Sequence, residues 1–354
     1  MTVAHDLTKA FEWFMKAAEK GHADAMFNVG MYYDGKGITG DKTKAFEWWL
    51  KAASKGHASA MNSVGVCFAI GKGVTQDKTK AFEWYLNAAN NGIVYAMNRI
   101  GEYYSSGEGV TQDNTQAFEW WLKAAEKGHV SAMSNVGLCY YNGKGVTQDK
   151  TKAFEWFKKA AENGNTDAMN NVGECYSQGE GVTQNLTNAY FWYKKAANKG
   201  HDSAMNNLGM CYYNGKCVKQ EFMMAFMWFK EAAEKGNIKA MNSVAVCYAN
   251  GQGVTSDKAK AFEWYLKSAE NGNSDAMNNL GLCYSKGEGV VKDLTKAFEW
   301  FKKGADQNNP TAVYKLAECY YYGYGTKTDT TKAYQLYEKA KSLGYNSSWS
   351  CTFQ

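Results

Sequence analysis

The chain of 354 residues lacks any run of 18 apolar residues, and its mean hydropathy is −0.53. A membrane-spanning helix needs about 20 predominantly apolar residues, so the sequence predicts no membrane span. The first residues, 1–9, also lack the apolar segment of a secretory leader. We therefore expect a cytoplasmic protein.

The net charge of the chain is also small for its length. Its 40 Lys and Arg residues stand against 35 Asp and Glu residues, which gives a net charge of +5. Domains that bind nucleic acid usually carry a clustered basic stripe, and this balance does not predict one. Nucleic acid is therefore not an expected partner.

Proline is almost absent, since Pro310 is the only one, and in its place the chain has a repeated unit. The string K-A-F-E-W recurs with its alanine at Ala45, Ala81, Ala153, Ala261 and Ala297, and variants of it centre on Ala10, Ala117, Ala189, Ala225 and Ala333. The spacing is 35 residues once and 36 thereafter. A period in this range indicates stacked structural repeats. Tetratricopeptide arrays fit poorly, because they run at 34 residues and usually carry a proline in each unit.

One unit, residues 149–182, predicts two helices. After Asp149 as N-cap, apolar residues at Ala153, Trp156/Phe157 and Ala160/Ala161 follow the stripe of an amphipathic helix, which we call the W-helix. Gly164 ends it. The second helix, which we call the M-helix, runs over 168–176 and contains a glycine that costs about 1 kcal/mol relative to alanine. A small residue kept at that cost predicts a close approach of two helices.

Charged residues on the W-helices predict ion pairs within each helix. Glutamate precedes lysine by four residues in the pairs Glu47–Lys51, Glu119–Lys123, Glu155–Lys159, Glu263–Lys267 and Glu299–Lys303. This order is the favourable one, and each pair is expected to stabilise its helix by roughly 0.2–0.5 kcal/mol.

The unit reads A-x-N-N-V/L-G-x-C-Y-x-x-G-x-G-V-x-x-D-x-x-x-A-x-x-W-x-x-x-A-A-x-x-G. It resembles the Sel-1-like repeat family, relatives of the tetratricopeptide repeat, and the resemblance extends from about Lys9 to Gly344. It implies an all-α fold, a right-handed α/α superhelical solenoid of about 19 helices in ~36-residue repeats. We expect one solenoid over 1–344, with nine full units after a lone helix, and a C-terminal tail over 345–354. The resemblance further implies a role in assembling protein complexes, without catalysis or cofactor.

Cysteine occupies one M-helix position in seven units: Cys67, Cys139, Cys175, Cys211, Cys247, Cys283 and Cys319. Equivalent positions of successive repeats are one repeat apart, whereas a disulfide needs Cα atoms ~4.4–6.8 Å apart. We therefore expect buried, reduced thiols, as in a reducing compartment. No unit has the paired Cys/His spacing of a metal site, so no metal is predicted. Near Cys211, the residues Cys217, Met223, Met224 and Met227 form a sulfur-rich segment that is either a soft-metal site or drift of the repeat.

Asparagine gives the candidate binding residues. On the M-helix, the first amide column is Asn62, Asn98, Asn170, Asn206, Asn242 and Asn278, and the second amide column is Asn28, Asn135, Asn171, Asn207 and Asn279. Both lie off the apolar face, and each amide can both donate to and accept from a peptide bond. The alternative is that these amides bond the scaffold itself. A third set of M-helix residues follows the second amide column by three positions and varies in type. This variable column is Met31, Val66, Glu102, Leu138, Glu174, Met210, Val246, Leu282 and Glu318.

These residues favour a non-enzymatic scaffold that binds a protein or extended peptide in the concave groove that the resemblance implies. The amide columns would hold the peptide backbone, and Glu102, Glu174, Tyr33 and Tyr140 would add specificity. Two other classes stay open. One is a structural spacer or self-assembling array, and the other is an exported, effector-type adaptor that acts on host proteins.

Overall fold

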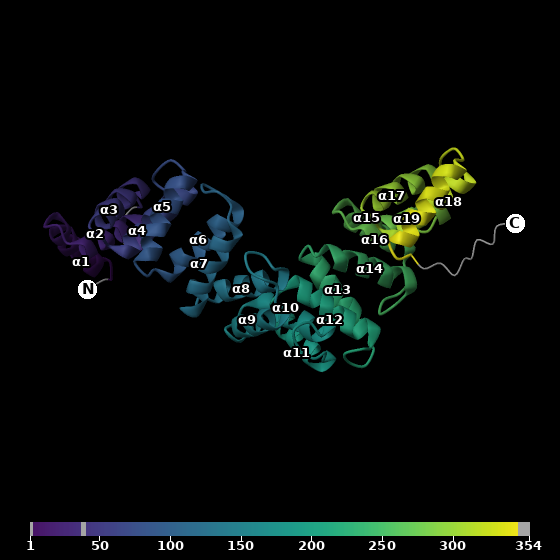
Figure 1. Cartoon of the computed structure of the whole chain (residues 1–354), viewed down its shortest axis with the longest axis horizontal. Helices are drawn as coiled ribbons and strands as arrows, with labels where there is room; N and C mark the ends of the chain where they lie inside the picture. The colour runs from purple at the N-terminus through teal and green to yellow at the C-terminus, as the bar shows by residue number, and fades with distance from the viewer. Residues whose placement is uncertain (1–2, 37–39, 346–354) are drawn as a thin grey trace. The chain divides into compact units, whose positions relative to one another are not determined.

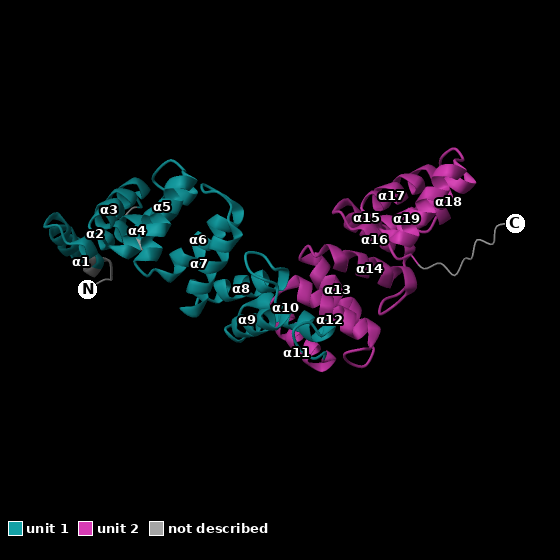
Figure 2. Cartoon of the chain, in the orientation of Figure 1, with its two compact units in different colours: residues 1–184 teal, residues 185–354 magenta. Residues whose placement is uncertain are grey.

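The computed structural model describes residues 3–36 and 40–345, and these residues form 19 α-helices, one π-helical turn, η1 (Tyr32–Lys36), and no strand. The all-α prediction with about 19 helices is therefore confirmed. The chain divides into two compact units, residues 1–184 and 185–354 (Figures 1 and 2). A single solenoid over 1–344 stays a prediction. Of the predicted tail, residues 346–354 lie outside the described residues.

The W-helices have odd numbers and the M-helices even numbers. Unit 1 contains α1 (Val3–Glu19), α2 (Ala23–Met31), α3 (Lys42–Ser54), α4 (Ala58–Ile70), α5 (Lys78–Asn90), α6 (Val94–Ser106), α7 (Asn114–Glu126), α8 (Val130–Asn142), α9 (Lys150–Glu162) and α10 (Thr166–Gln178). Unit 2 contains α11 (Leu186–Ala197), α12 (Asp202–Asn214), α13 (Phe222–Glu234), α14 (Ile238–Asn250), α15 (Lys258–Glu270), α16 (Ser274–Lys286), α17 (Leu294–Asp306), α18 (Pro310–Tyr322) and α19 (Thr330–Ser342). Within each unit, every helix packs on the next one in sequence.

Side chains cap both kinds of helix at their N-termini. In α9 the carboxylate of Asp149 accepts the backbone N–H of Lys152 at 3.0 Å, which confirms the predicted cap. At the M-helices Asn165 accepts the N–H of Ala168 at 2.7 Å, and the ring Nδ1 of His57 accepts that of Ala60 at 3.0 Å. Most of the His and Asn residues that follow the W-helix glycine cap their M-helix in this way; His22 is an exception and makes no such bond.

The glycine inside the M-helix lies directly under an aromatic ring of the following W-helix. At Gly137 a Cβ would lie 2.5 Å from Cδ1 of Phe157, and at Gly101 it would lie 2.5 Å from Cδ1 of Trp121. Such contacts are too short for any side chain, so the close helix approach predicted from this glycine is confirmed. Both rings belong to the buried face of their W-helix.

In seven repeats the glycine-rich loop after the M-helix packs on the start of the preceding W-helix. Gly181 has a φ of +71°, and a Cβ there would lie 1.9 Å from the carbonyl oxygen of Lys150. The neighbouring Glu180 accepts from the Tyr141 hydroxyl and pairs with the Lys150 ammonium at 3.4 Å. Two other repeats make the same loop-to-helix ion pair, Lys78–Glu108 at 3.1 Å and Lys258–Glu288 at 3.2 Å.

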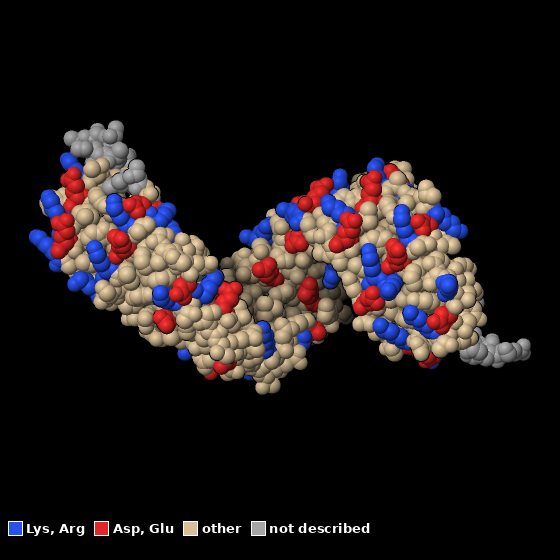
Figure 3. All heavy atoms as spheres, turned by 90° about the horizontal axis from the view of Figure 1, so that it is seen from above, with Lys and Arg blue, Asp and Glu red and all other residues tan. Residues whose placement is uncertain are grey.

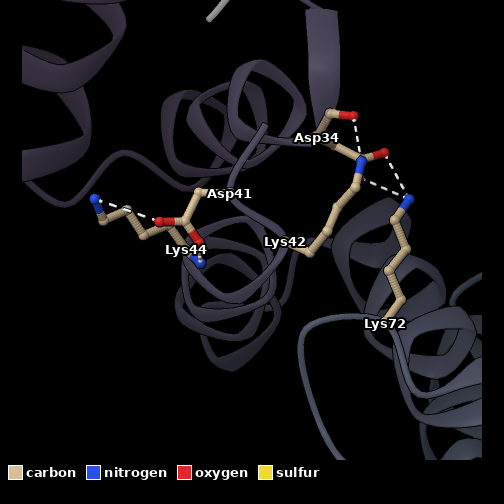
Figure 4. A network of polar contacts seen from close by, with 5 residues as sticks. All are labelled: Asp34, Asp41, Lys42, Lys44 and Lys72. Carbon is tan, nitrogen blue, oxygen red and sulfur yellow. Dashed lines mark hydrogen bonds and ion pairs between the residues drawn. The ribbon is translucent and has the colours of Figure 1, made fainter. Parts of the chain in front are cut away.

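Where the loop after α4 packs on the start of α3, the charges differ, because both the loop and the helix carry a lysine and Asp34 pairs with both (Figure 4). Asp34, just after α2, lies between two lysines, with Lys72 Nζ at 2.6 Å and Lys42 Nζ at 3.0 Å from its Oδ1 atom. Burial by itself raises the pKa of Asp34, but the hydrogen bonds and charges of Lys72 and Lys42 outweigh it and hold the pKa below its ordinary value. The carboxylate thus joins two successive repeats.

We expect Asp34→Asn to destabilise unit 1 at pH 7 by about 1 kcal/mol or less, because the ion pairs are partly exposed. The lowered pKa makes this contribution present above the unfolded-state pKa and lost as the pH falls through the folded-state pKa. Urea unfolding should therefore show a gap between wild type and variant at pH 7 that closes toward pH 3. The exposed Asp306→Asn serves as control. A gap that is equal at both pH values would contradict this assignment.

The predicted Glu–Lys pairs on the W-helices are wrong. None of the five is among the ion pairs of the described residues, and the lysines lie over the tryptophan three residues earlier instead. The ammonium is 4.4 Å from the ring centroid in Lys51–Trp48 and 3.9 Å in Lys303–Trp300. A ring face attracts a cation as a carboxylate does, but it also packs against the aliphatic stem of the lysine, which an exposed carboxylate cannot do. On the face seen in Figure 3, acidic and basic side chains are interspersed over both units.

Candidate functional site

The M-helices hold all three columns of candidate binding residues. The first amide column is mostly interior, with exposed fractions of 3% for Asn98, 6% for Asn170, 8% for Asn206 and 7% for Asn278. Asn62 and Asn242 are half-buried. These amides therefore lie beneath the surface of the M-helix face and offer a ligand little direct contact.

Two amides of this column donate to a glutamate of the variable column one turn later. Asn98 Nδ2 donates to Glu102 at 2.8 Å, and Asn170 Nδ2 donates to Glu174 at 3.0 Å. The amide oxygens of Asn62, Asn98, Asn206 and Asn278 are buried and have no partner among the described residues. Buried acceptors without a partner are uncommon, and here they recur at one position of the repeat.

The second amide column lies nearer the surface. Asn171, Asn207 and Asn279 are all half-buried. In unit 2, Asn279 Nδ2 donates to Asn242 Oδ1 at 3.1 Å and so joins the two amide columns of successive M-helices, α14 and α16. This bond is the kind of scaffold contact that the sequence left open as an alternative to ligand binding.

The variable column contains two exposed apolar side chains. Leu138 is 41% exposed and Met210 is 39% exposed, whereas Glu102 is half-buried and also pairs with Arg99. In the last repeat, Glu318 pairs with Lys315 at 2.8 Å. The acidic members therefore bond to residues of their own helix, and of the apolar members Leu138 and Met210 are exposed while the other four are half-buried.

The two tyrosines expected to add specificity pack against W-helices. Tyr140 meets Phe118 edge to face with centroids 5.3 Å apart, and Tyr33 meets Phe11 at 5.6 Å. The same edge-to-face arrangement recurs through the array, for example between Phe154 and Tyr176 at 5.2 Å. Such pairs stabilise helix packing. The geometry thus gives both rings a scaffold contact.

A cavity of about 330 Å³ opens in unit 2 between α16, α17 and α18. Its apolar lining includes Leu282, Phe301 and Cys319. Its charged lining is Lys286, Lys292, Lys315 and Glu318. Leu282 and Glu318 belong to the variable column of successive M-helices, and Lys315 stands where other repeats carry the second amide.

Comparison with protein families shows what these repeats are. The family model for the Sel1 repeat matches ten consecutive segments, 1–22, 23–57, 58–93, 94–129, 130–165, 166–201, 202–237, 238–273, 274–309 and 310–345. The chain belongs to the Sel1 repeat family. The resemblance proposed from the repeated motif is therefore confirmed.

Solved Sel1 repeat structures share the fold. The chain is similar to c5321, a protective antigen of uropathogenic Escherichia coli with this fold, at 30% identity over 94% of this chain and 87% of that one, with a TM-score of 0.62. It is also similar to a Sel1 repeat protein from Oxalobacter formigenes, at 27% identity over 88% and 93% of the two chains, with a TM-score of 0.66. The search of curated proteins gives no match.

The cysteines of the Sel1 repeats are buried thiols, as predicted. All seven column cysteines are free and less than 9% exposed. Burial raises the pKa of the thiol to about 11 at Cys67, Cys139 and Cys175. Protonated, buried thiols are poor nucleophiles and poor metal ligands. In the described residues no three His, Cys, Asp or Glu side chains gather as a metal site, and no helix has the length and apolar character to cross a membrane.

Sequence reasoning missed the cavity in the last two Sel1 repeats. The signal was present, since Tyr314 and Lys315 stand at the two amide columns of α18. These two residues replace asparagine with an aromatic and a basic side chain, and Lys315 is part of the cavity lining.

Proposed function

We propose that this Sel1 repeat chain is a non-enzymatic scaffold that binds a protein or an extended peptide along the faces formed by its M-helices. The observation that carries the proposal is the cavity between α16 and α18. Its lining combines the variable column of two successive repeats with an apolar floor. A groove that reads side chains needs variable residues at such positions, while the rest of the repeat stays constant.

The cavity also supports a preference for one kind of ligand side chain. Leu282 and Phe301 offer an apolar floor, and three lysines face one glutamate around it. An apolar side chain next to a carboxylate matches both features, because the first removes apolar surface from water and the second meets the lysines. We therefore propose that peptides with an acidic and an apolar residue in sequence bind at this end of the array.

The amide columns take different parts in this proposal. The second column, Asn171, Asn207 and Asn279, is half-buried and so is near enough to the surface to contact a peptide backbone. The first column would support it from below, by orienting residues such as Glu102 and Glu174. For the compartment, one buried thiol per repeat favours a reducing one such as the cytoplasm.

The test begins with a library of random peptides displayed on phage and selected on the full chain. The selected peptide is then titrated by fluorescence anisotropy. We expect Lys292→Glu to weaken its binding about 10-fold, as the loss of one ion pair of ~1.4 kcal/mol would. Leu282→Trp, which fills the cavity, is expected to weaken it at least as much, and Asn279→Ala to weaken it less.

The matched control is Lys302→Glu, which makes the same charge change at an exposed position of α17 outside the cavity. Circular dichroism on each variant checks that helicity is retained. Equal losses at Lys292 and Lys302 would show that the peptide responds only to net charge. Unchanged binding in Leu282→Trp would exclude the cavity.

A further inference from the structure

The loop between α12 and α13 departs from the other Sel1 loops at its second glycine position. In seven other repeats the second loop glycine has a φ between +68° and +77°, and a Cβ there would lie 1.9–2.5 Å from a backbone carbonyl group at the start of the preceding W-helix. These glycines are Gly73, Gly109, Gly145, Gly181, Gly253, Gly289 and Gly325. In this loop the position is occupied by Cys217.

The cysteine forces a different loop conformation. Asn308 is the one non-glycine with positive φ in the part of the chain described, so Cys217 does not take the backbone conformation of those glycines. Its side chain instead meets the cysteine of its own M-helix, with the sulfurs of Cys211 and Cys217 2.8 Å apart. The six other column cysteines have a glycine at the equivalent loop position, and none of them has a second sulfur there.

The two thiols differ in access to solvent. Cys211 is 4% exposed, within the last turn of α12, whereas Cys217 is half-buried in the loop. Burial raises the pKa of the Cys211 thiol, and its contact with Cys217 raises it further. An oxidant in solution therefore reaches Cys217 first, and Cys211 is placed to react second.

We propose that Cys211 and Cys217 form a disulfide that is made and broken by exchange with small-molecule disulfides and thiols, and that this bond fixes the loop between α12 and α13. The sulfurs need to approach by only ~0.8 Å more to reach the bond length of a disulfide. This bond would explain why Cys217 stands where the other loops have glycine, because its sulfur lies next to that of Cys211.

The exchange with oxidised glutathione proceeds in two balanced steps. The Cys217 thiolate attacks one sulfur of glutathione disulfide, a mixed disulfide forms, and one glutathione thiolate leaves and takes up the proton that Cys217 released. The Cys211 thiol then loses its proton and attacks the Cys217 sulfur, and the second glutathione leaves as a thiol. Two protein thiols are oxidised, and one glutathione disulfide is reduced to two thiols.

The test uses the full chain in glutathione buffers of stepped ratio, followed by acid quenching, alkylation under denaturing conditions and peptide mass spectrometry. We expect one linkage, Cys211–Cys217, to appear with a loss of two alkylated sites, and excess reduced glutathione to restore both. In Cys211→Ser we expect Cys217 to accumulate as the glutathione mixed disulfide. The control Cys175→Ser, which alters a column cysteine without a loop partner, should form the linkage to the wild-type extent.

A second measurement keeps the outcome independent of how the variants fold. Trypsin cleavage after Lys216 in the wild-type chain should leave the two fragments joined when oxidised and separate them when reduced, since Lys216 lies between the cysteines. Wild-type chain that keeps glutathione on Cys217 with Cys211 free, or that links either cysteine elsewhere, would overturn the proposal. So would oxidation of other column cysteines at the same buffer ratio.

Discussion

Phe157→Ala is expected to lower the free energy of unfolding by about 3–5 kcal/mol, the cost of a buried phenylalanine truncated to alanine. The ring is 1% exposed and covers Gly137 of the preceding M-helix. Because that glycine has no side chain to move into the space, the cavity cannot collapse. We expect the loss to fall on α8 and α9, since repeats are stabilised mainly by their neighbours.

Native-state hydrogen exchange measures this effect better than a single unfolding curve, because a repeat array need not unfold in two states. The amides of α8 and α9 should lose more protection than those of α3 and α4. The control is Trp156→Ala, which removes a larger side chain that is only half-buried and stacks with Lys159. A larger loss for Trp156→Ala than for Phe157→Ala would show that side-chain size outweighs burial here.

Gly181→Ala is expected to lower the free energy of unfolding by about 2–4 kcal/mol, in the range of strongly destabilising single substitutions. Two effects combine, since the φ of +71° is unfavourable for alanine and its Cβ would lie 1.9 Å from the Lys150 carbonyl oxygen. The atoms in the way belong to the backbone of α9, so no side-chain rotation relieves the contact.

Gly164→Ala separates the two effects in the same repeat. Its φ is +96°, but a Cβ there would meet nothing within 4 Å, so we expect a cost of only about 1 kcal/mol. Urea unfolding of both variants gives the difference, which reports the close approach of loop and helix alone. Equal costs would mean that the backbone conformation accounts for everything and that the loop can withdraw from Lys150.

Much of this fold could be predicted from the sequence because the repeat averages over many copies. The cap at Asp149 and the helix end at Gly164 follow from local chemistry that recurs in most repeats. The close approach at Gly137 could be predicted because a glycine inside a helix destabilises it relative to alanine, so its presence indicates that no larger side chain fits there. Repetition also made each departure visible, as at Cys217.

The side-chain partners were harder to predict, because periodicity places a residue on a face without saying what covers it. Asn98 and Asn170 lie off the apolar stripe, yet both are buried and hydrogen-bonded to glutamates one turn later. Lys159 has both Glu155 and Trp156 within reach along its helix, and it lies over Trp156. Such choices depend on the neighbouring helix and on solvent, which the sequence of one repeat does not contain.

The ion pairs between loop and preceding helix have a consequence for how such an array can change by recombination. Repeats of 36 residues could be lost or duplicated as blocks without altering any helix. The loop residue Glu108, however, pairs with Lys78, while the next loop carries Lys144 opposite Asn114. A deletion that brought the loop of Lys144 onto the helix that begins at Lys78 would set two lysines against each other. The repeats therefore share one backbone structure but differ in the charge of the residues where loop and helix meet. This difference favours the present order of repeats over a rearranged order.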